Sequence, residues 1–236
     1  MRPVLSLLQF TTLLPVGKPL DFDLFARHSW IFPIAGYVIA LLVAIPVFFI
    51  RDTVLAAAVA VAGVILLSGA HHFDGLLDLG DGLMAQGDRE KRTRALTDRC
   101  VGAGGIAAGI VVTLLLFAGL HSATSLISAL IIGEVAAKFS MAFLTTYGAP
   151  FKEGMHSYLH RFSKPWFPFL SLLLCIPLVL LPVSPFRLAV AALMMILCPV
   201  VLLTISERTF GGVNGDVVGA SNEITRALVV VALALV

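Results

Sequence analysis

The chain has 236 residues, of which 59% are hydrophobic and 13% are charged, and its formal net charge at pH 7 is +2. The charged fraction is about half that of an ordinary soluble domain, and several charge-free stretches are long enough to cross a bilayer. The small net charge argues against a nucleic-acid partner. We therefore predict an all-α, polytopic integral membrane protein in which residues 1–236 form a single domain.

Seven apolar segments are candidates for transmembrane helices. In chain order they are Ile31–Ile50, Val54–Ala70, Val101–Leu120, Ala123–Tyr147, Trp166–Val183, Leu188–Ile205 and Ala227–Val236. Each should be helical, because a helix satisfies its own backbone hydrogen bonds in lipid. The seventh segment is short unless it begins earlier, within the glycine-bearing run before it. We therefore expect a bundle of six to seven transmembrane helices.

The connections between these segments differ in their content of Lys and Arg. The connections on the side of the N-terminus hold thirteen such residues, whereas the opposite side holds only Arg51 and Arg187, and Lys138 lies within a span. Lys and Arg are enriched in cytoplasmic loops. We therefore predict a multi-pass plasma membrane protein with its N-terminus and its second-to-third connection in the cytoplasm.

That second-to-third connection contains a helix with an acidic face. On a helical wheel, Asp74, Asp78 and Asp81 lie within about 60° of one another, opposite the apolar side chains. Gly75 and Gly82 lie beside the acids, where a missing side chain lets a ligand approach closely. A charge at mid-bilayer costs roughly 2.5–3.5 kcal/mol, so we place this Asp-rich helix at the cytoplasmic surface.

The clustered carboxylates suggest a metal site. Like charges on one helix face repel each other, and a bound divalent cation would remove that penalty. Carboxylates with open coordination positions suit Mg²⁺, which shares its ligand shell with substrate phosphates. The alternative is a solvated loop helix with unrelated acids. Downstream, Arg92, Arg94 and Arg99 could bind phosphate, although each also fits the positive-inside pattern.

A second acidic element precedes the last apolar segment. Asp216 and Glu223 are seven residues apart, so they lie on one face if the segment is helical. Gly212 and Gly215 come just before Asp216. This element could contact a nucleotide opposite the first acidic helix. Alternatively, it is a re-entrant turn with helix-packing glycines.

Two further polar groups have helical spacing. Glu134 and Lys138 are four residues apart inside a span, which indicates either a functional pair or a mutually neutralising pair that packs the bundle. Glu153, His156 and His160 have spacings that could bind a metal, but a loop with two unrelated histidines is the favoured interpretation.

The Asp-rich helix and four other segments resemble one known family, cobalamin-5′-phosphate synthase, also called adenosylcobinamide-GDP ribazoletransferase. The run from His72 to Gly82 resembles the family signature H-x-D-G-L-x-D-x-x-D-G. The stretches LQFTTLLPVG, FPIAG, GAPFKEGMHSYL and FGGVNGDVVGASNEI resemble its other motifs in order. The similarity extends from residue 8 to about residue 224, so it covers nearly the whole chain.

The resemblance implies a Mg²⁺-dependent transferase in the last steps of cobalamin biosynthesis. Members join adenosylcobinamide-GDP to α-ribazole or to α-ribazole 5′-phosphate, giving adenosylcobalamin or its 5′-phosphate and GMP. The implied cofactor is Mg²⁺, and the implied partners are these two substrates and membrane lipid. The choice between free and phosphorylated α-ribazole stays open, as does homo-oligomerisation.

The resemblance also suggests roles for individual residues. We predict that Asp74, Asp78 and Asp81 hold one or two Mg²⁺ ions, and that one of them or Asp98 accepts the proton of the attacking hydroxyl. The predicted substrate-binding residues are His72, Gly75, Gly82, Arg92, Arg99, Lys138, Gly212, Gly215, Asp216 and Glu223. The family commonly has D-S-R-x-G where this chain has DRCVG, so the arginine here stands one place earlier.

Two other functions fit parts of the pattern. A prenyltransferase-like intramembrane enzyme also binds pyrophosphate through Mg²⁺ and Asp-rich helices, but it would need two such helices. A cation transporter would place acids near mid-bilayer in repeated units. The sequence has one Asp-rich helix and no visible repeat, so both alternatives are weaker than the transferase.

Overall fold

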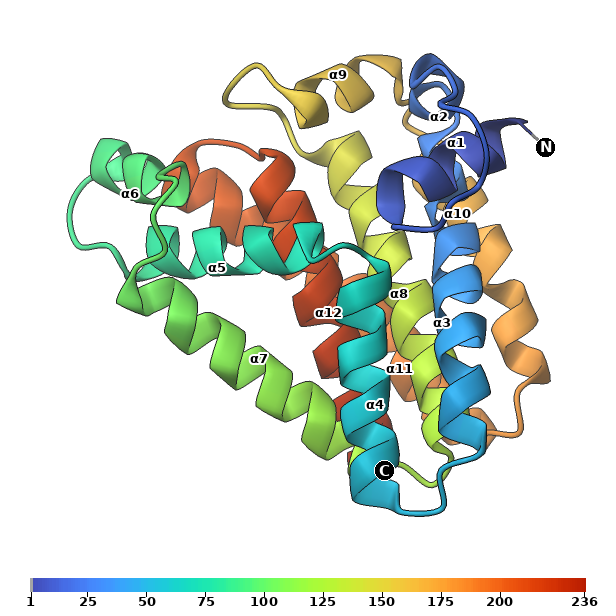
Figure 1. Cartoon of the computed structure of the whole chain (residues 1–236). Coiled ribbons are helices and arrows are strands. Elements are labelled where there is room, and N and C mark those ends of the chain that lie inside the picture. The colour runs from blue at the N-terminus through green and yellow to red at the C-terminus, as the bar shows by residue number, and fades with distance from the viewer. Residues whose placement is uncertain (1) are drawn as a thin grey trace.

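The computed structural model describes residues 2–236, and all regular elements within them are helical (Figure 1). The longer helices are α3 (Phe32–Phe48), α4 (Thr53–Leu67), α7 (Ala103–Ser122), α8 (Leu126–Tyr147), α11 (Pro185–Phe210) and α12 (Gly215–Leu235). The shorter ones are α1 (Arg2–Thr11), α2 (Asp23–Ala26), η1 (Ser29–Ile31), α5 (His71–Met84), α6 (Arg89–Leu96), α9 (Met155–Phe162), α10 (Phe167–Cys175) and η2 (Ile176–Leu180).

The prediction of an all-α multi-pass membrane protein is confirmed. Five helices are long and apolar enough to cross a membrane, namely α3 with η1, α7, α8, α11 and α12. Two bent pairs also pass together, α4 with α5 and α9 with α10–η2, so there are up to seven crossings if each bent pair counts as one span. The bends are 94° and 93°. Because α5 and α9 run across the bundle, we place both outside the membrane-spanning segments.

The last helix begins earlier than the predicted span Ala227–Val236. Helix α12 starts at Gly215, and its added turns contain the polar residues Asn222, Glu223 and Arg226. All three side chains are buried. Arg226 pairs with Glu134 of α8 as well as with Glu223 of its own helix. Asn222 accepts a hydrogen bond from Lys138 of α8. The local sequence cannot reveal these partners on α8.

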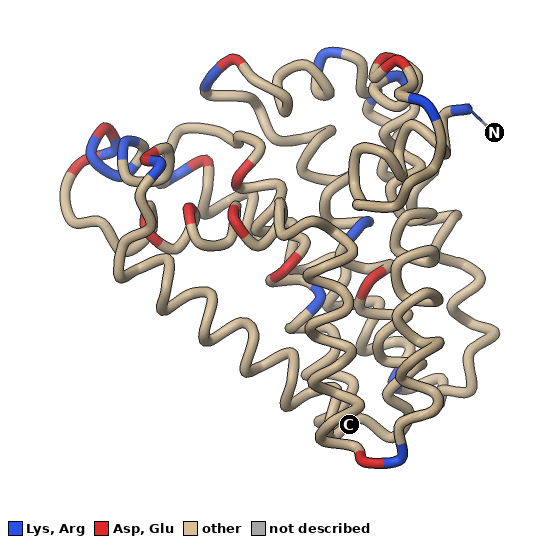
Figure 2. Tube along the Cα trace, viewed as in Figure 1, with Lys and Arg blue, Asp and Glu red and all other residues tan. Residues whose placement is uncertain are grey.

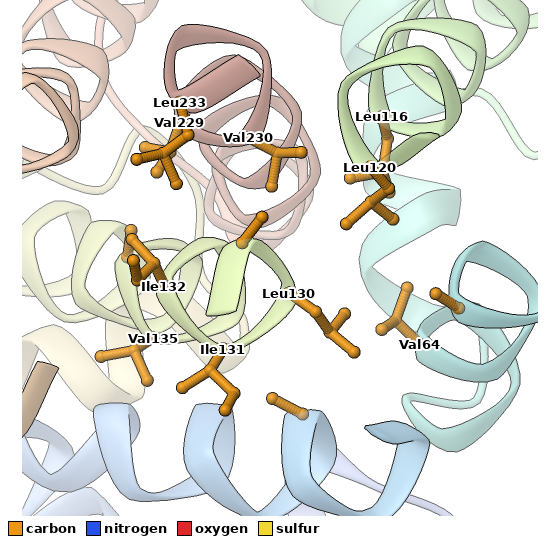
Figure 3. Packing of buried hydrophobic residues seen from close by; sticks show 14 of the residues in the cluster. Val64, Leu116, Leu120, Leu130, Ile131, Ile132, Val135, Val229, Val230 and Leu233 are labelled. Carbon is orange, nitrogen blue, oxygen red and sulfur yellow. The ribbon is translucent and has the colours of Figure 1, made fainter. Parts of the chain in front are cut away.

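Helix α8 is the central helix of the bundle and packs against α3, α10, α11 and α12. Figure 3 shows apolar side chains around α8, where Leu130 points toward Val64 of α4. Helices α8 and α12 approach closely at Gly133, where an added Cβ would lie 2.7 Å from Val230. Small residues allow such close packing in lipid, where the hydrophobic effect cannot drive it.

A sharp turn sets the direction of the Asp-rich helix α5. Gly69 and Ala70, which join α4 to α5, have positive φ values of +66° and +58°. A left-handed alanine costs roughly 1–2 kcal/mol. The packing of α5 against α7 and α12 must offset this cost. The turn lays α5 across one end of the bundle (Figure 1).

Charged residues gather at the end of the bundle that holds α5, α6 and α9 (Figure 2). The opposite end includes the α3–α4 connection, with Arg51 and Asp52. This distribution agrees with the count of Lys and Arg in the connections. Which end faces the cytoplasm stays a prediction.

Candidate active site

Acidic side chains collect where α5 crosses the first turn of α12. The pKa of Asp78 is raised to about 7 by partial burial and by the negative charges of Asp216, Asp74 and Asp81. Lys152 opposes this shift. Its Nζ lies 3.9 Å from Asp216 Oδ2. The acids therefore repel one another, and the nearby cation relieves that repulsion only in part.

Helices α5 and α12 meet closely because Gly75 has no side chain. An added Cβ at Gly75 would lie 2.5 Å from the backbone oxygen of Asp216. At Gly82 it would lie 2.9 Å from Leu96 and from the ring of Phe210. Both glycines are buried. The structure thus gives them a packing role rather than the open approach expected from sequence, and a contact of either with substrate stays a prediction.

Asp81 joins α5 to the start of α7. Its two oxygens accept hydrogen bonds from the backbone N–H groups of Gly102 at 2.7 Å and Gly105 at 2.8 Å. These N–H groups belong to a helix N-terminus, which favours a negative charge. Asp98 lies in the loop before α7, where it accepts the N–H of Cys100 at 3.0 Å. Asp81 and Asp98 line a shallow hollow of their own.

Arg92 and Arg99, the two arginines predicted to bind substrate, have different surroundings. Arg92 donates to the backbone oxygens of Leu83 at 2.9 Å and Gly87 at 3.3 Å, so it caps the end of α5. Arg99 is exposed in the loop between α6 and α7. Phosphate binding by either residue stays a prediction.

A charged network lies inside the bundle between α8 and α12. Arg226 forms an ion pair with Glu134 and donates to the two oxygens of Glu223 at 2.6 and 3.1 Å. Lys138 donates to Asn222 at 2.7 Å, and Asn222 donates to Glu223 at 2.9 Å. All five residues are at most 3% exposed. Two anions and two cations balance, as buried charges require.

This network changes the partners expected from sequence spacing. Glu134 binds Arg226 and Lys138 binds Asn222, so neither is the direct partner of the other. Glu223 likewise lies within the network, and Asp216 lies at the surface end of the same helix. Substrate contacts of Lys138 and Glu223 stay predictions.

A cavity of about 630 Å³ opens beside Asp216. The predicted residue His72 lines it, as do Gln9 and Phe10 of α1. Lys152, Gly154 and Gly215 form its exposed rim, and buried residues form its floor, among them Phe32, Met141, Thr145, His156 and Leu159.

Two loops far apart in sequence are joined beside this rim. The N–H of Val213 donates to the Ala149 oxygen at 2.8 Å, and the N–H of Phe151 donates to the Val213 oxygen at 3.4 Å. The join brings Lys152 to Asp216. Sequence analysis missed Lys152 because a single lysine between two spans differs in no visible way from other positive-inside residues.

The glycine-rich loop before α12 shapes the start of that helix. An added Cβ at Gly212 would collide with the backbone oxygen of Ala149, so glycine is needed for the join. Asn214 caps α12 by accepting the N–H of Val217 at 3.0 Å. Gly215 borders open space. Substrate contacts of Gly212 and Gly215 stay predictions.

The acids fit Mg²⁺ in donor type and in charge, since carboxylate oxygens are its usual ligands. Within residues 2–236, however, no three His, Cys, Asp or Glu side chains lie close enough together to hold a metal ion as they stand. The histidines of α9 are engaged elsewhere: His156 contacts the Gly148 oxygen at 2.9 Å, and His160 contacts the Thr145 oxygen at 3.0 Å.

Comparison with known proteins identifies the family. The model of the family described as Cobalamin-5-phosphate synthase matches residues 3–234. The chain belongs to this family. No solved structure matches the chain.

Relatives that carry the name adenosylcobinamide-GDP ribazoletransferase occur in several archaea. The protein of Methanocella arvoryzae is 36% identical, over 92% of this chain and 89% of its own length. That of Archaeoglobus fulgidus is 36% identical over 100% and 98%, and that of Halorubrum lacusprofundi is 35% identical over 93% and 91%. The resemblance seen in the sequence motifs is thereby confirmed.

Proposed function

We propose that this chain is an adenosylcobinamide-GDP ribazoletransferase, which joins adenosylcobinamide-GDP to α-ribazole or its 5′-phosphate. The observation that carries the proposal is the family match over residues 3–234. The named relatives are similar over most of their own length and of this chain. The family favours neither a prenyltransferase-like enzyme nor a cation transporter.

The proposed reaction is an exchange at one phosphorus atom. A hydroxyl oxygen of α-ribazole bonds to the phosphorus attached to the cobinamide arm. The bond from that phosphorus to the bridging oxygen of the diphosphate breaks, and GMP leaves with the electron pair. The hydroxyl proton passes to a base, for which Asp74, Asp78, Asp81 and Asp98 are the candidates. A phosphodiester links the two substrates at the end.

Mg²⁺ is the proposed cofactor. Asp74 and Asp78 would hold it, together with Asp81 and with Asp216 beside them, and bound there it would neutralise charge on the diphosphate. The raised pKa of Asp78, caused by burial and by the neighbouring acids, supports the need for a cation at this place.

The chain itself supplies further positioning groups. Lys152 carries positive charge at the rim of the cavity beside Asp216. The N-terminus of α12 lies at the same rim, and helix N-termini favour phosphate groups. We propose that this end of the bundle faces the cytoplasm and that lipid surrounds the apolar helices.

Turnover by the purified full chain in detergent tests the proposal. Adenosylcobinamide-GDP, α-ribazole and Mg²⁺ are combined, and GMP and the corrinoid product are measured together. We expect equal amounts of both, and neither when α-ribazole or Mg²⁺ is omitted. Absence of GMP release with free and with phosphorylated α-ribazole would show that the proposed function is wrong.

A further inference from the structure

The cavity beside Asp216 has a mainly apolar floor and a charged rim. The floor contains the buried apolar side chains of Phe32, Met141 and Leu159. The rim contains the exposed Lys152 and the first turn of α12, next to the acids. Apolar walls with a few polar groups are typical of small-molecule sites, and the cavity volume of about 630 Å³ lies in the range of such sites. The cavity therefore fits a ligand with a ring system at one end and negative charge at the other.

Three polar atoms of lining residues lack hydrogen-bond partners within residues 2–236. They are His72 Nδ1, Thr145 Oγ1 and His156 Nδ1. Each of these residues is at most 7% exposed. A buried polar atom without a partner costs about 1–3 kcal/mol, so native proteins seldom keep several around one cavity. A polar ligand in the floor would relieve this cost.

His156 indicates which hydrogen-bonding group such a ligand must carry. Its Nε2 lies 2.9 Å from the Gly148 oxygen, so Nε2 carries the proton and donates. Burial lowers the pKa of His156 to about 4, so the ring is neutral at pH 7. In this tautomer Nδ1 can only accept a hydrogen bond. The floor therefore calls for a ligand with an N–H or O–H donor.

The bases of the two substrates of the proposed reaction differ in this respect, although both substrates also carry ribose hydroxyls. Guanine has a ring N–H and an amino group along one edge. The benzimidazole base of α-ribazole has a single free ring nitrogen, which accepts and does not donate. The hydrogen-bonding groups of the floor, His156 Nδ1 and the hydroxyl of Thr145 among them, therefore match the base guanine better than benzimidazole.

From this match we propose that the cavity binds the guanine nucleotide half of adenosylcobinamide-GDP, with the base in the floor and the diphosphate at the rim beside Lys152. The proposal rests on the proposed function and assigns one of its two substrates to a place. It puts the diphosphate next to Asp78 and Asp216, where the exchange would occur. α-Ribazole must then approach from outside the cavity.

A matched pair of neighbouring threonines tests the floor. Thr145 and Thr146 are both buried, and both have a hydroxyl without a partner within residues 2–236, but only Thr145 lines the cavity. GDP binding to the full chain is measured in detergent with Mg²⁺ by calorimetry. We expect Thr145→Val to weaken GDP about tenfold, the effect of one lost hydrogen bond. Thr146→Val should leave GDP affinity unchanged.

A second pair of variants tests the rim. Lys152→Ala should weaken GDP about tenfold and leave guanosine, which has no phosphate, unaffected. Lys164→Ala is the control, since Lys164 is exposed and does not line the cavity. Equal losses in the two lysine variants would show a general effect of surface charge and would overturn the assignment of the rim.

Competition between ligands tells the two substrates apart. We expect GMP to displace bound GDP and α-ribazole not to do so. Displacement of GDP by α-ribazole, with weaker α-ribazole binding in Thr145→Val, would assign the cavity to the other substrate and overturn the proposal. Failure of the wild type to bind GDP would also overturn it, even if the chain releases GMP in the turnover assay. That assay tests the function separately.

Discussion

The two charged regions of the molecule differ in how their charge is compensated. Between α8 and α12, Arg226 binds both Glu134 and Glu223, and Lys138 binds Asn222, so the buried charges balance within the protein. At the crossing of α5 and α12, several acids lie near one lysine, Lys152, whose Nζ is 3.9 Å from Asp216 and which offsets their repulsion only in part.

This difference distinguishes a buried network that stabilises the fold from a group of acids that is available for the reaction. A charge removed from water must be paired at once, because the cost of leaving it alone is several kcal/mol. Acids that keep contact with water can stay partly uncompensated until a cation or a ligand arrives. The place where compensation is incomplete, rather than the place with most charge, is therefore where we expect the reaction.

The largest expected effect comes from unbalancing the buried network. Arg226→Leu leaves Glu134 and Glu223 without their cation, which should lower the free energy of unfolding by about 3–5 kcal/mol. Thermal unfolding and yield in detergent measure it. The control is Arg94→Leu, since Arg94 is exposed and pairs with the exposed Glu90. Similar stability of the two variants would contradict a balanced network.

Removing a carboxylate at the crossing of α5 and α12 should lower activity far more than stability, the reverse of the Arg226 variant. Asp78→Asn should lower GMP release at least about a hundredfold while the protein stays folded, because a group next to the reacting phosphates is lost. Asp74→Asn and Asp81→Asn should also lose far more turnover than abundance. Glu90→Gln, an exposed acid away from the cluster, should keep normal activity. Near-normal rates in all three aspartate variants would show that the proposed Mg²⁺ site is wrong.

The crossing of α5 and α12 can be forced apart with one methyl group. Gly75→Ala places a Cβ against the Asp216 backbone, which should lower the free energy of unfolding by about 1–3 kcal/mol. Gly215→Ala is the matched control for stability, because Gly215 borders open space. If both alanines are tolerated equally, the helices are not held at the distance described.

The smallest expected effect is on the dependence of stability on pH. The folded-state pKa of Asp78, about 7, lies above its ordinary value of 3.8, so its contribution to stability falls as pH rises through that window. Mg²⁺ competes with the proton and should bind more tightly at pH 8 than at pH 6. We expect Mg²⁺ to raise the melting temperature by a few degrees at pH 8, roughly the effect of 1 kcal/mol, and by less at pH 6.

The variant Asp78→Asn checks the origin of this effect. It should be more stable than the wild type at pH 8 without metal, and it should gain less from Mg²⁺. An identical response of the two proteins to pH and to Mg²⁺ would mean that Asp78 does not titrate in this range.

The membrane spans could be predicted because continuous apolar runs need no knowledge of neighbours. The first predicted span, Ile31–Ile50, corresponds to α3 (Phe32–Phe48), and the fourth, Ala123–Tyr147, corresponds to α8 (Leu126–Tyr147). The acidic face of α5 could likewise be derived from helical spacing alone. Both inferences use only residues that are close in sequence.

The missed features all depend on residues that are far apart in sequence. The polar first half of α12 is helical inside the bundle because Arg226 meets Glu134 of another helix. Lys152 joins the site because the Ala149–Phe151 segment pairs with Val213. The cavity needs α1, α8, α9 and α12 together, and no single segment carries its signal.

The backbone join at Val213 has a mechanical consequence. With two hydrogen bonds tying it to Ala149 and Phe151, the loop before α12 cannot shift without dragging the start of the α8–α9 loop along. Lys152 and Asp216 therefore lie on one joined segment rather than on two independent loops. A shift of this segment would move the lysine ammonium and the aspartate carboxylate together, so contact with a bound anion and the arrangement of the acids would be coupled.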